Sequence, residues 1–290
     1  MSAPAQCVQL GEGLRRLTAP NPGLMTGEGT NTFIVGYEEL VIVDPGPAID
    51  SHINALAELV GDKLAAIVVT HTHADHSPAA FELARRTGAP QYGALSCHKH
   101  FQDHSFRPDH LLVHDGRLPH GDSPLRSIHT PGHVDNHFCL LQEASGIVLA
   151  GDHMMQGSTV VIVPPQGDMA EYIVSLQRLL EYQPRAIAPA HGEMIEDPAA
   201  EVAALIAHRL ARESRIYAVC AAAVEATTDD LLPRAYDDVD PSLHRIARYS
   251  LLAHLFKLEK EQRVARLNRG AGGDDRQLDS SEAPWRWRAT

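Results

Sequence analysis

Reactive side chains are most concentrated in the segment Thr70-His71-Thr72-His73-Ala74-Asp75-His76, where three imidazoles and one carboxylate fall within six residues. The segment follows the apolar run 65–69, which predicts a buried strand. Alternate side chains of an extended segment point to the same side, so His71 and His73 can share one metal ion. The turn that follows re-aims Asp75 and His76, which can serve a second ion close by. Imidazole and carboxylate ligands suit zinc, iron or manganese.

The plain alternative is a solvated polar turn whose histidines are coincidental. Three imidazoles beside a buried strand would then leave polar nitrogens in need of partners, which disfavours this alternative.

Three further candidate ligands also follow apolar runs. They are His133 in Thr130-Pro131-Gly132-His133, Asp152 after Gly151, and His191 in Ala190-His191-Gly192. Each alone would be an ordinary loop residue, but open α/β sheets build sites at the ends of their strands. Together with the first cluster, these residues therefore predict a two-metal site.

The elements that must position these residues alternate along the chain. Short runs rich in β-branched residues predict buried strands at 32–35, 40–43, 65–69, 146–150 and 186–188. Helical spacing of apolar residues predicts helices at 49–60 and 169–182, and a third begins at Pro78 and is stopped by Gly88. Strands that alternate with helices indicate a layered α/β domain.

Other segments interrupt this alternation. We interpret residues 14–30 as a loop rich in Pro and Gly, and residues 97–124 as a flap or insertion rich in His, Asp and Pro. Residues 196–269 are predicted to be mostly helical, with an acidic loop near 229–241. We therefore expect an α/β domain over 1–200, a mostly helical domain over 201–269 and a disordered tail over 270–290.

Composition restricts the class of protein further. The chain has 290 residues, 44% of them hydrophobic, which is enough for a sizeable core. The four cysteines are scattered without a CxxC pair, no run approaches the ~18 apolar residues of a membrane helix, and Met1 to Gly13 does not resemble a signal peptide. We expect a cytoplasmic protein with no membrane partner.

The ordered set HxHxDH, then His, Asp and His, resembles the metallo-β-lactamase superfamily. This resemblance implies a four-layer αββα fold with a dinuclear site. The implied ligands are His71, His73 and His133 for the first metal ion, Asp75, His76 and His191 for the second, and Asp152 as the bridge. Asp44, in Val43-Asp44-Pro45-Gly46, is implied to orient a ligand histidine.

Longer strings are similar to the β-lactamase-like protein 2 group, which carries a small winged-helix-like domain after the hydrolase domain. They are Asn21-Pro22-Gly23, Gly29-Thr30-Asn31-Thr32-Phe33, Pro131-Gly132-His133 and the stretch from Gly151 to Gly167. The chain has Ser77-Pro78-Ala79-Ala80 where many members have glycines. It also lacks the cysteine ligand of the commonest antibiotic-cleaving enzymes.

The predicted function is a dinuclear hydrolase. Two divalent ions, expected to be zinc with iron or manganese as alternatives, would convert a bridging water to hydroxide near neutral pH. That hydroxide would attack an ester, thioester or similar bond of a small molecule, with Asp75 and Asp152 positioning it. Three alternatives stay open: a single-strand-preferring endoribonuclease, as the group resemblance implies, an iron-dependent sulfur dioxygenase, and a non-catalytic regulator of the same fold.

Charge distinguishes the expected partners. The net charge of −12 favours a small-molecule substrate over a polyanion. Single-stranded RNA is the alternative partner, because residues 245–269 carry the basic side chains Arg245, Arg248, Lys257, Lys260, Arg263, Arg266 and Arg269. The plainer interpretation is a helical cap with a solvated basic face, and a homodimer stays open.

Two minor hypotheses remain. Asn31, Ser158 and Thr159 are candidates for contact with the substrate. Six histidines, at positions 98, 100, 104, 110, 114 and 120, form either a further metal cluster or, as we favour, a solvated mobile flap.

Overall fold

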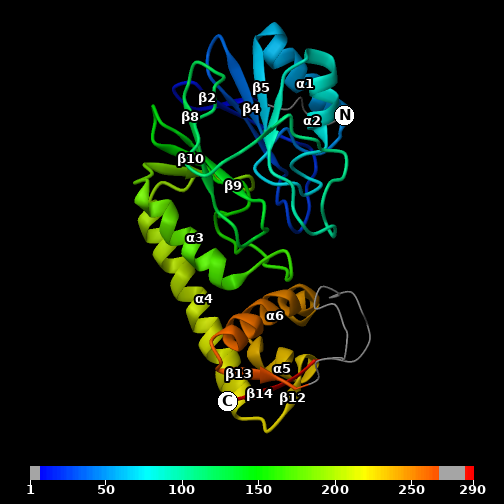
Figure 1. Ribbon diagram of the computed structural model, residues 1–290, viewed down its shortest axis with the longest axis vertical. Helices are drawn as coiled ribbons and strands as arrows, with labels where there is room; N and C mark the ends of the chain where they lie inside the picture. Colours follow the sequence, from blue (N-terminus) through cyan, green and yellow to red (C-terminus); the bar gives the residue numbers. More distant parts are fainter. Residues whose placement is uncertain (1–6, 268–284) are drawn as a thin grey trace. The chain divides into compact units, whose positions relative to one another are not determined.

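The computed structural model describes residues 7–267 and 285–290 (Figure 1). Its contacts divide the chain into two compact units. The first comprises Met1–Pro131, Asn136–Val160 and Ser175–Ala199, and the second comprises Gly132–Asp135, Val161–Val174 and Ala200–Thr290. None of the described helices is both long enough and apolar enough to cross a membrane.

The first unit contains a seven-stranded sheet in which the strands follow chain order. Its strands are β1 (Val8–Gly11), β2 (Leu14–Thr18), β3 (Asn31–Val35), β4 (Leu40–Val43), β5 (Leu64–Val68), β6 (Gln91–Gly93) and β7 (His110–Leu111). Pairing is antiparallel up to β4 and parallel from β4 to β7. The carboxyl ends of β4 and β5 therefore lie side by side at one edge.

A second, four-stranded sheet has the order β11-β10-β9-β8. Its strands are β8 (Leu125–His129), β9 (Phe138–Gln142), β10 (Ile147–Leu149) and β11 (Ala186–Ala188). The β10 and β11 strands are parallel, so their carboxyl ends also meet at one edge.

Two apolar clusters hold the layers of the first unit together. Phe33, Val43 and Val68 of the first sheet pack with Leu140 and Leu149 of the second. On its other face, the first sheet packs against α1 (Asp50–Val60) and α2 (Ala79–Thr87). A sheet buried on both faces needs apolar residues without alternation, which is why its strands appear in the sequence as continuous runs.

Helix α3 (Met169–Glu181) runs beside the second sheet. The Arg178 guanidinium donates to the backbone oxygen of His129 in β8 at 2.9 Å, and the Ser175 hydroxyl donates to that of Pro131 at 2.7 Å. The layered α/β architecture expected from the sequence is confirmed, as are the predicted strands and helices of this unit. Gly88 ends α2 in the left-handed conformation, as predicted.

The prediction that residues 14–30 form a loop is wrong in part. Residues 14–18 form strand β2, which pairs with β3 from Leu14↔Val35 to Thr18↔Asn31. The sequence does not predict this strand because only two of its residues, Leu14 and Leu17, are apolar. In the structure both are fully buried. Within 97–124, the short strand β7 pairs with β6, and the rest is irregular.

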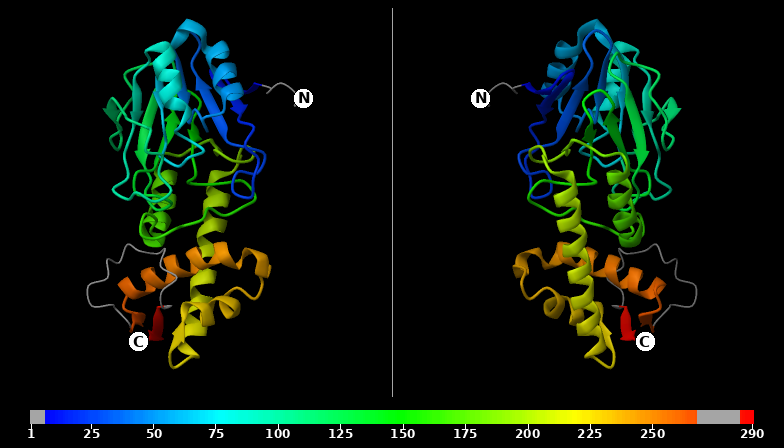
Figure 2. Two further views of the ribbon diagram at one scale, coloured as in Figure 1. Left: turned by 90° about the vertical axis from the view of Figure 1, so that its right-hand side faces the viewer. Right: turned by 90° about the vertical axis from the view of Figure 1, so that its left-hand side faces the viewer.

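The second unit contains helices and a small sheet. Helices α4 (Pro198–Ala221), α5 (Thr228–Ala235) and α6 (His244–Lys260) accompany a three-stranded sheet of β12 (Ala226–Thr227), β14 (Arg286–Ala289) and β13 (Val264–Arg266). Helix α6 lies across the second half of α4, and the Lys257 ammonium donates to the Glu213 carboxylate at 2.9 Å (Figure 2). Trp287, Leu251, Leu255 and Ile216 belong to its core.

Two predictions for this part of the chain need correction. The acidic stretch near 229–241 is helical up to Ala235, because Thr227 and Asp230 form a capping box that starts α5. Most of the predicted disordered tail, residues 270–284, lies outside the described residues. Its end forms strand β14, because alternation places Trp287 in the core between two exposed arginines.

Candidate metal centre

The candidate ligands gather at the strand ends just described. Thr70 to His76 follow β5, Asp44 follows β4, Asp152 follows β10 and His191 follows β11. Because parallel neighbours end at the same edge, residues distant in sequence come together there.

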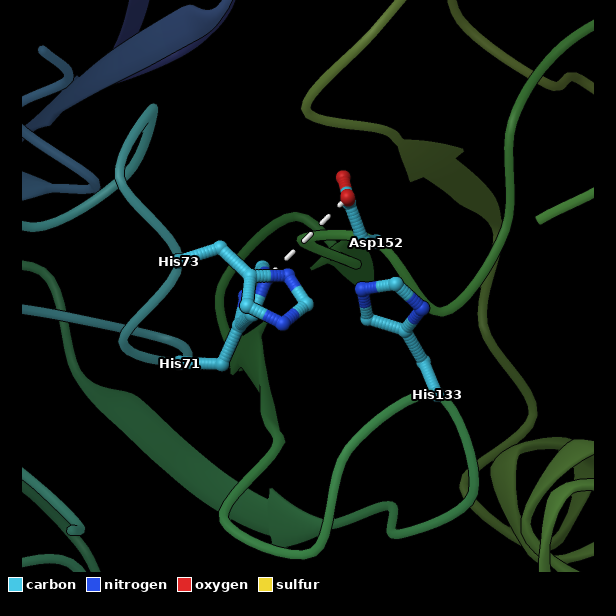
Figure 3. Close-up of side chains that lie close together, drawn as sticks. All are labelled: His71, His73, His133 and Asp152. Atoms are coloured by element: carbon cyan, nitrogen blue, oxygen red, sulfur yellow. Dashed lines mark hydrogen bonds and ion pairs between the residues drawn. The ribbon is translucent and has the colours of Figure 1, made fainter. Parts of the chain in front are cut away.

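Two groups of potential metal ligands result. One consists of His71, His73, His133 and Asp152, and is drawn in Figure 3. The other consists of Asp75, His76 and His191. Within each group every residue offers one ligand atom, and these atoms lie within 4.8 Å of one another. The structure thus brings together all seven residues predicted from the sequence.

The Asp152 carboxylate faces both groups. Its Oδ1 atom lies 3.2 Å from His191 Nε2 and 3.4 Å from His76 Nε2, while Oδ2 lies 4.0 Å from His71 Nε2. This is the placement that a bridging ligand requires.

Hydrogen bonds on the outer side of each ring fix the imidazole orientations. His133 Nδ1 donates to the backbone oxygen of Val161 at 2.9 Å, and His191 Nδ1 donates to that of Gly29 at 3.1 Å. A carbonyl can only accept, so each Nδ1 carries a proton, and in the neutral ring Nε2 is then the nitrogen with a free lone pair. Metal-binding histidines are held in the same way. The donor set therefore fits divalent metal ions.

Asp44 links the two groups of ligands through hydrogen bonds, directly to His76 and through Thr70 to His71. Its Oδ1 accepts the backbone N–H of Thr70 at 2.7 Å, and its Oδ2 accepts the Thr70 hydroxyl at 2.7 Å and His76 Nδ1 at 2.9 Å. Because the Thr70 hydroxyl donates its only proton to Asp44, it must accept the second hydrogen bond, which His71 Nδ1 donates at 3.1 Å. The buried carboxylate thus aims one histidine of each group, which is the geometry that its predicted orienting role needs.

His137 also supports the site, although its sequence context predicts no role for it. This fully buried imidazole accepts the backbone N–H of Asp152 at Nε2, 3.1 Å away, and contacts the Thr130 hydroxyl through Nδ1 at 2.9 Å. Gly151 fits beside it because a Cβ there would lie 2.7 Å from His137 Nε2. The only sequence signal was its position four residues after His133.

Asn31, a predicted substrate contact, is held by hydrogen bonds to the protein's own backbone. Its side chain is buried and donates to the backbone oxygens of Pro189 at 3.0 Å and Gly192 at 2.9 Å, so it holds the loop that carries His191. Ser158 and Thr159 are exposed. Among the described residues, no group of three potential metal ligands contains more than one of the six histidines between 98 and 120.

Burial and charge strongly perturb the pKa values of the two groups. Burial lowers the pKa of His71 well below its usual value, and His76 and His73 add to this effect. Burial alone would also lower the pKa of His191, but the nearby Asp152 carboxylate outweighs it and raises the pKa to about 10. Burial opposes ionisation of Asp75, yet His76 holds its pKa well below the usual range. Such mutual perturbation in one cluster is typical of a functional site.

Comparison with known proteins identifies the class. Residues 25–191 match the Metallo-beta-lactamase superfamily, and residues 227–273 match the Beta-lactamase associated winged helix domain. The chain therefore belongs to the metallo-β-lactamase superfamily and carries the C-terminal winged-helix domain that its resemblance implied.

Individual proteins of this superfamily are similar to most of the chain. The chain is 29% identical over 270 residues to a Beta-lactamase-like protein 2 homolog of Drosophila melanogaster, covering 86% of this chain and 88% of the relative. It is 27% identical over 240 residues to an Atrochrysone carboxyl ACP thioesterase of Passalora fulva, covering 79% and 69%. A Beta-lactamase domain protein from Burkholderia ambifaria shares the fold at a TM-score of 0.78 and 20% identity, covering 100% of this chain and 95% of that one.

Proposed function

We propose that this protein is a metal-dependent hydrolase that cleaves an ester or thioester bond of a small acyl compound. The observation that carries the proposal is the Asp152 carboxylate placed between two histidine-rich groups. Divalent ions held there, zinc by our proposal and iron or manganese as alternatives, would activate water near neutral pH and polarise the attacked carbonyl. His71, His73 and His133 would hold one ion, Asp75, His76 and His191 the other, and Asp152 both.

The chain's own residues have distinct tasks in this proposal. Asp44 and the backbone oxygens of Val161 and Gly29 keep the imidazoles in the ligating tautomer. Asp75 is the more accessible acidic group, with 27% of its side chain exposed against 9% for Asp152. Its carboxylate is placed to accept a hydrogen bond from an incoming water. Hydrolysis of a thioester would then release a carboxylic acid and a thiol.

The charge pairing of the second unit favours a small acyl substrate over RNA. The basic side chains of α6 and β13 are largely paired with carboxylates of the same unit: Arg248 with Asp229 at 3.1 Å, Lys257 with Glu213 at 2.9 Å, Lys260 with Asp168, Arg263 with Glu213 at 3.4 Å and Arg266 with Glu259 at 3.5 Å. Arg269 lies outside the described residues. A cation already paired in the protein gains less from a phosphate, so this surface offers weak binding to a polyanion. The thioesterase named among the relatives also supports an acyl substrate.

One parallel assay tests the proposal. Metal-loaded protein is incubated with an acetyl thioester and with labelled single-stranded RNA, and metal content is measured for each sample. Asp152→Ala should abolish thioester hydrolysis, whereas Asp62→Ala, an exposed aspartate in the short helix at 61–63, should retain it.

Other outcomes support the alternatives. RNA cleavage that depends on Asp152, without thioester hydrolysis, would replace this proposal with the endoribonuclease. Oxygen consumption with a persulfide by iron-loaded protein would point to the sulfur dioxygenase. A protein that retains no metal would point to the non-catalytic regulator.

A further inference from the structure

Phe101 is a large apolar side chain in an unfavourable position. Its side chain is 62% exposed, and its backbone is left-handed with φ of 62°. That conformation costs an L-residue other than glycine about 1–2 kcal/mol. A single exposed apolar residue needs no explanation. An exposed phenylalanine that also keeps a strained backbone does, because Gly or Asn would relieve the strain.

The loop that carries Phe101 is fastened to the ligand motif. Gln102 forms a β-bridge with His73, and Asp103 N donates to the Thr72 backbone oxygen at 2.6 Å. The Ser77 hydroxyl donates to Asp103 Oδ2 at 2.7 Å.

Further contacts fix the loop from both sides. The Thr72 hydroxyl also donates to Gln102 Oε1. Phe106, five residues after Phe101, is fully buried in the cluster beneath α2. The loop is therefore held rigidly while Phe101 is kept out of the core.

These contacts place the backbone of Phe101 one residue from a direct partner of the ligand motif. Its Cα lies about 3.8 Å along the chain from that of Gln102, which pairs directly with His73. Leu95, on the same loop, is 52% exposed. Asn136 ties this part of the loop to the motif as well, since its amide donates to the Ala94 backbone oxygen and to the Thr72 hydroxyl, each at 2.8 Å.

We infer that Phe101 contacts the apolar chain of the substrate and gives the enzyme a preference for longer acyl groups. This inference rests on the proposed acyl hydrolase function. A substrate with its carbonyl at the His and Asp groups would extend its acyl chain over the adjoining loop. Burial of methylene groups against the ring would supply the preference. Phe101 is then a specificity-determining residue and not part of the hydrolytic machinery.

The test compares octanoyl and acetyl thioesters in metal-loaded, full-length protein, with hydrolysis followed by loss of thioester absorbance. Phe101→Asn removes the ring, and asparagine tolerates the left-handed backbone. We expect the octanoyl-to-acetyl ratio of kcat/KM to fall about tenfold in this variant, and Phe101→Leu to retain most of it. Phe81→Ala, which removes a 56% exposed phenylalanine from α2, is the matched control and should keep the wild-type ratio. A ratio in Phe101→Asn within twofold of wild type would overturn the inference while leaving the hydrolase proposal intact.

A binding measurement separates the two proposals if no thioester is hydrolysed. Octanoate and acetate are titrated into wild type and Phe101→Asn by calorimetry. Octanoate binding weakened severalfold by Phe101→Asn would uphold the contact with Phe101 and reject the acyl hydrolase. Equal octanoate binding by both proteins would reject the inference as well.

Discussion

Replacing Asp44 with asparagine should weaken metal binding, although Asp44 is not itself one of the candidate metal ligands. The carboxylate accepts three hydrogen bonds, two from Thr70 and one from His76. An amide has one acceptor oxygen, and its nitrogen only donates. If that oxygen takes the Thr70 N–H, the amide nitrogen faces His76 Nδ1. His76 must then accept there and carry its proton on Nε2, the atom that faces Asp75 and Asp152.

The size of the effect follows from the lost hydrogen bond. His76 and Asp44 are both buried, and their contact is 2.9 Å. Hydrogen bonds to charged groups contribute about 1.5–3 kcal/mol. At about 1.4 kcal/mol per tenfold, this predicts roughly 10- to 150-fold weaker binding at the group of Asp75, His76 and His191. Binding at the other group should weaken less, because Asp44 reaches His71 only through Thr70.

The assay is a zinc titration of metal-free protein against a chromophoric chelator. Asp122→Asn is the matched control, because Asp122 also accepts backbone N–H groups, those of Tyr37, Glu38 and Glu39, in a turn between β3 and β4. Urea unfolding of each metal-free variant separates lost affinity from lost folding. If Asp44→Asn bound zinc within twofold of Asp122→Asn, the tautomer argument would be refuted.

Three further predictions concern stability. Gly132→Ala should destabilise the protein by about 3 kcal/mol or more, because the new Cβ would lie 2.3 Å from Tyr172 Cα. Gly157→Ala, also at positive φ but with open space, should cost only about 1–2 kcal/mol, and equal costs in urea unfolding would contradict the clash. Burial lowers the pKa of His52 to about 4, so below pH 6.5 the folded state binds fewer protons than the unfolded state. The free energy of unfolding should therefore fall by about 3 kcal/mol as the pH drops from 6.5 to 4. Urea unfolding at several pH values should show a correspondingly smaller loss for His52→Gln than for wild type, and an unchanged loss would exclude His52 as its source. Trp287→Ala should destabilise the second unit by about 3–5 kcal/mol, because Trp287 is fully buried. Trp285→Ala should cost less, because Trp285 is only half-buried. Hydrogen exchange at β13 would measure both effects, and equal effects would be evidence against a core role for Trp287.

The basic segment shows how tertiary contacts change the meaning of a sequence pattern. As a string, residues 245–269 have the excess of cations that a phosphate-binding surface needs. In the folded chain, Lys260 pairs with Asp168 and Arg248 with Asp229, partners that lie 92 and 19 residues away. The local charge count therefore overstates the positive charge available to a ligand.

The sequence by itself determined the layered fold and the centre of the candidate site. Strands buried on both faces must be continuously apolar, so β3, β4 and β5 were visible without any partner. The motif from His71 to His76 was visible because its members are neighbours in the chain. Strands β2 and β14 were missed because each buries only part of its residues and is defined by its pairing partner.

Only the tertiary structure decided which atoms face the centre. The backbone oxygens of Val161 and Gly29 lie 28 and 162 residues from the histidines that they orient, and every residue has such an oxygen. Sequence therefore cannot single them out. The role of His137 and the placement of Phe101 also depend on how distant segments pack, because a hydrogen bond needs atoms about 3 Å apart and local preference does not set that distance.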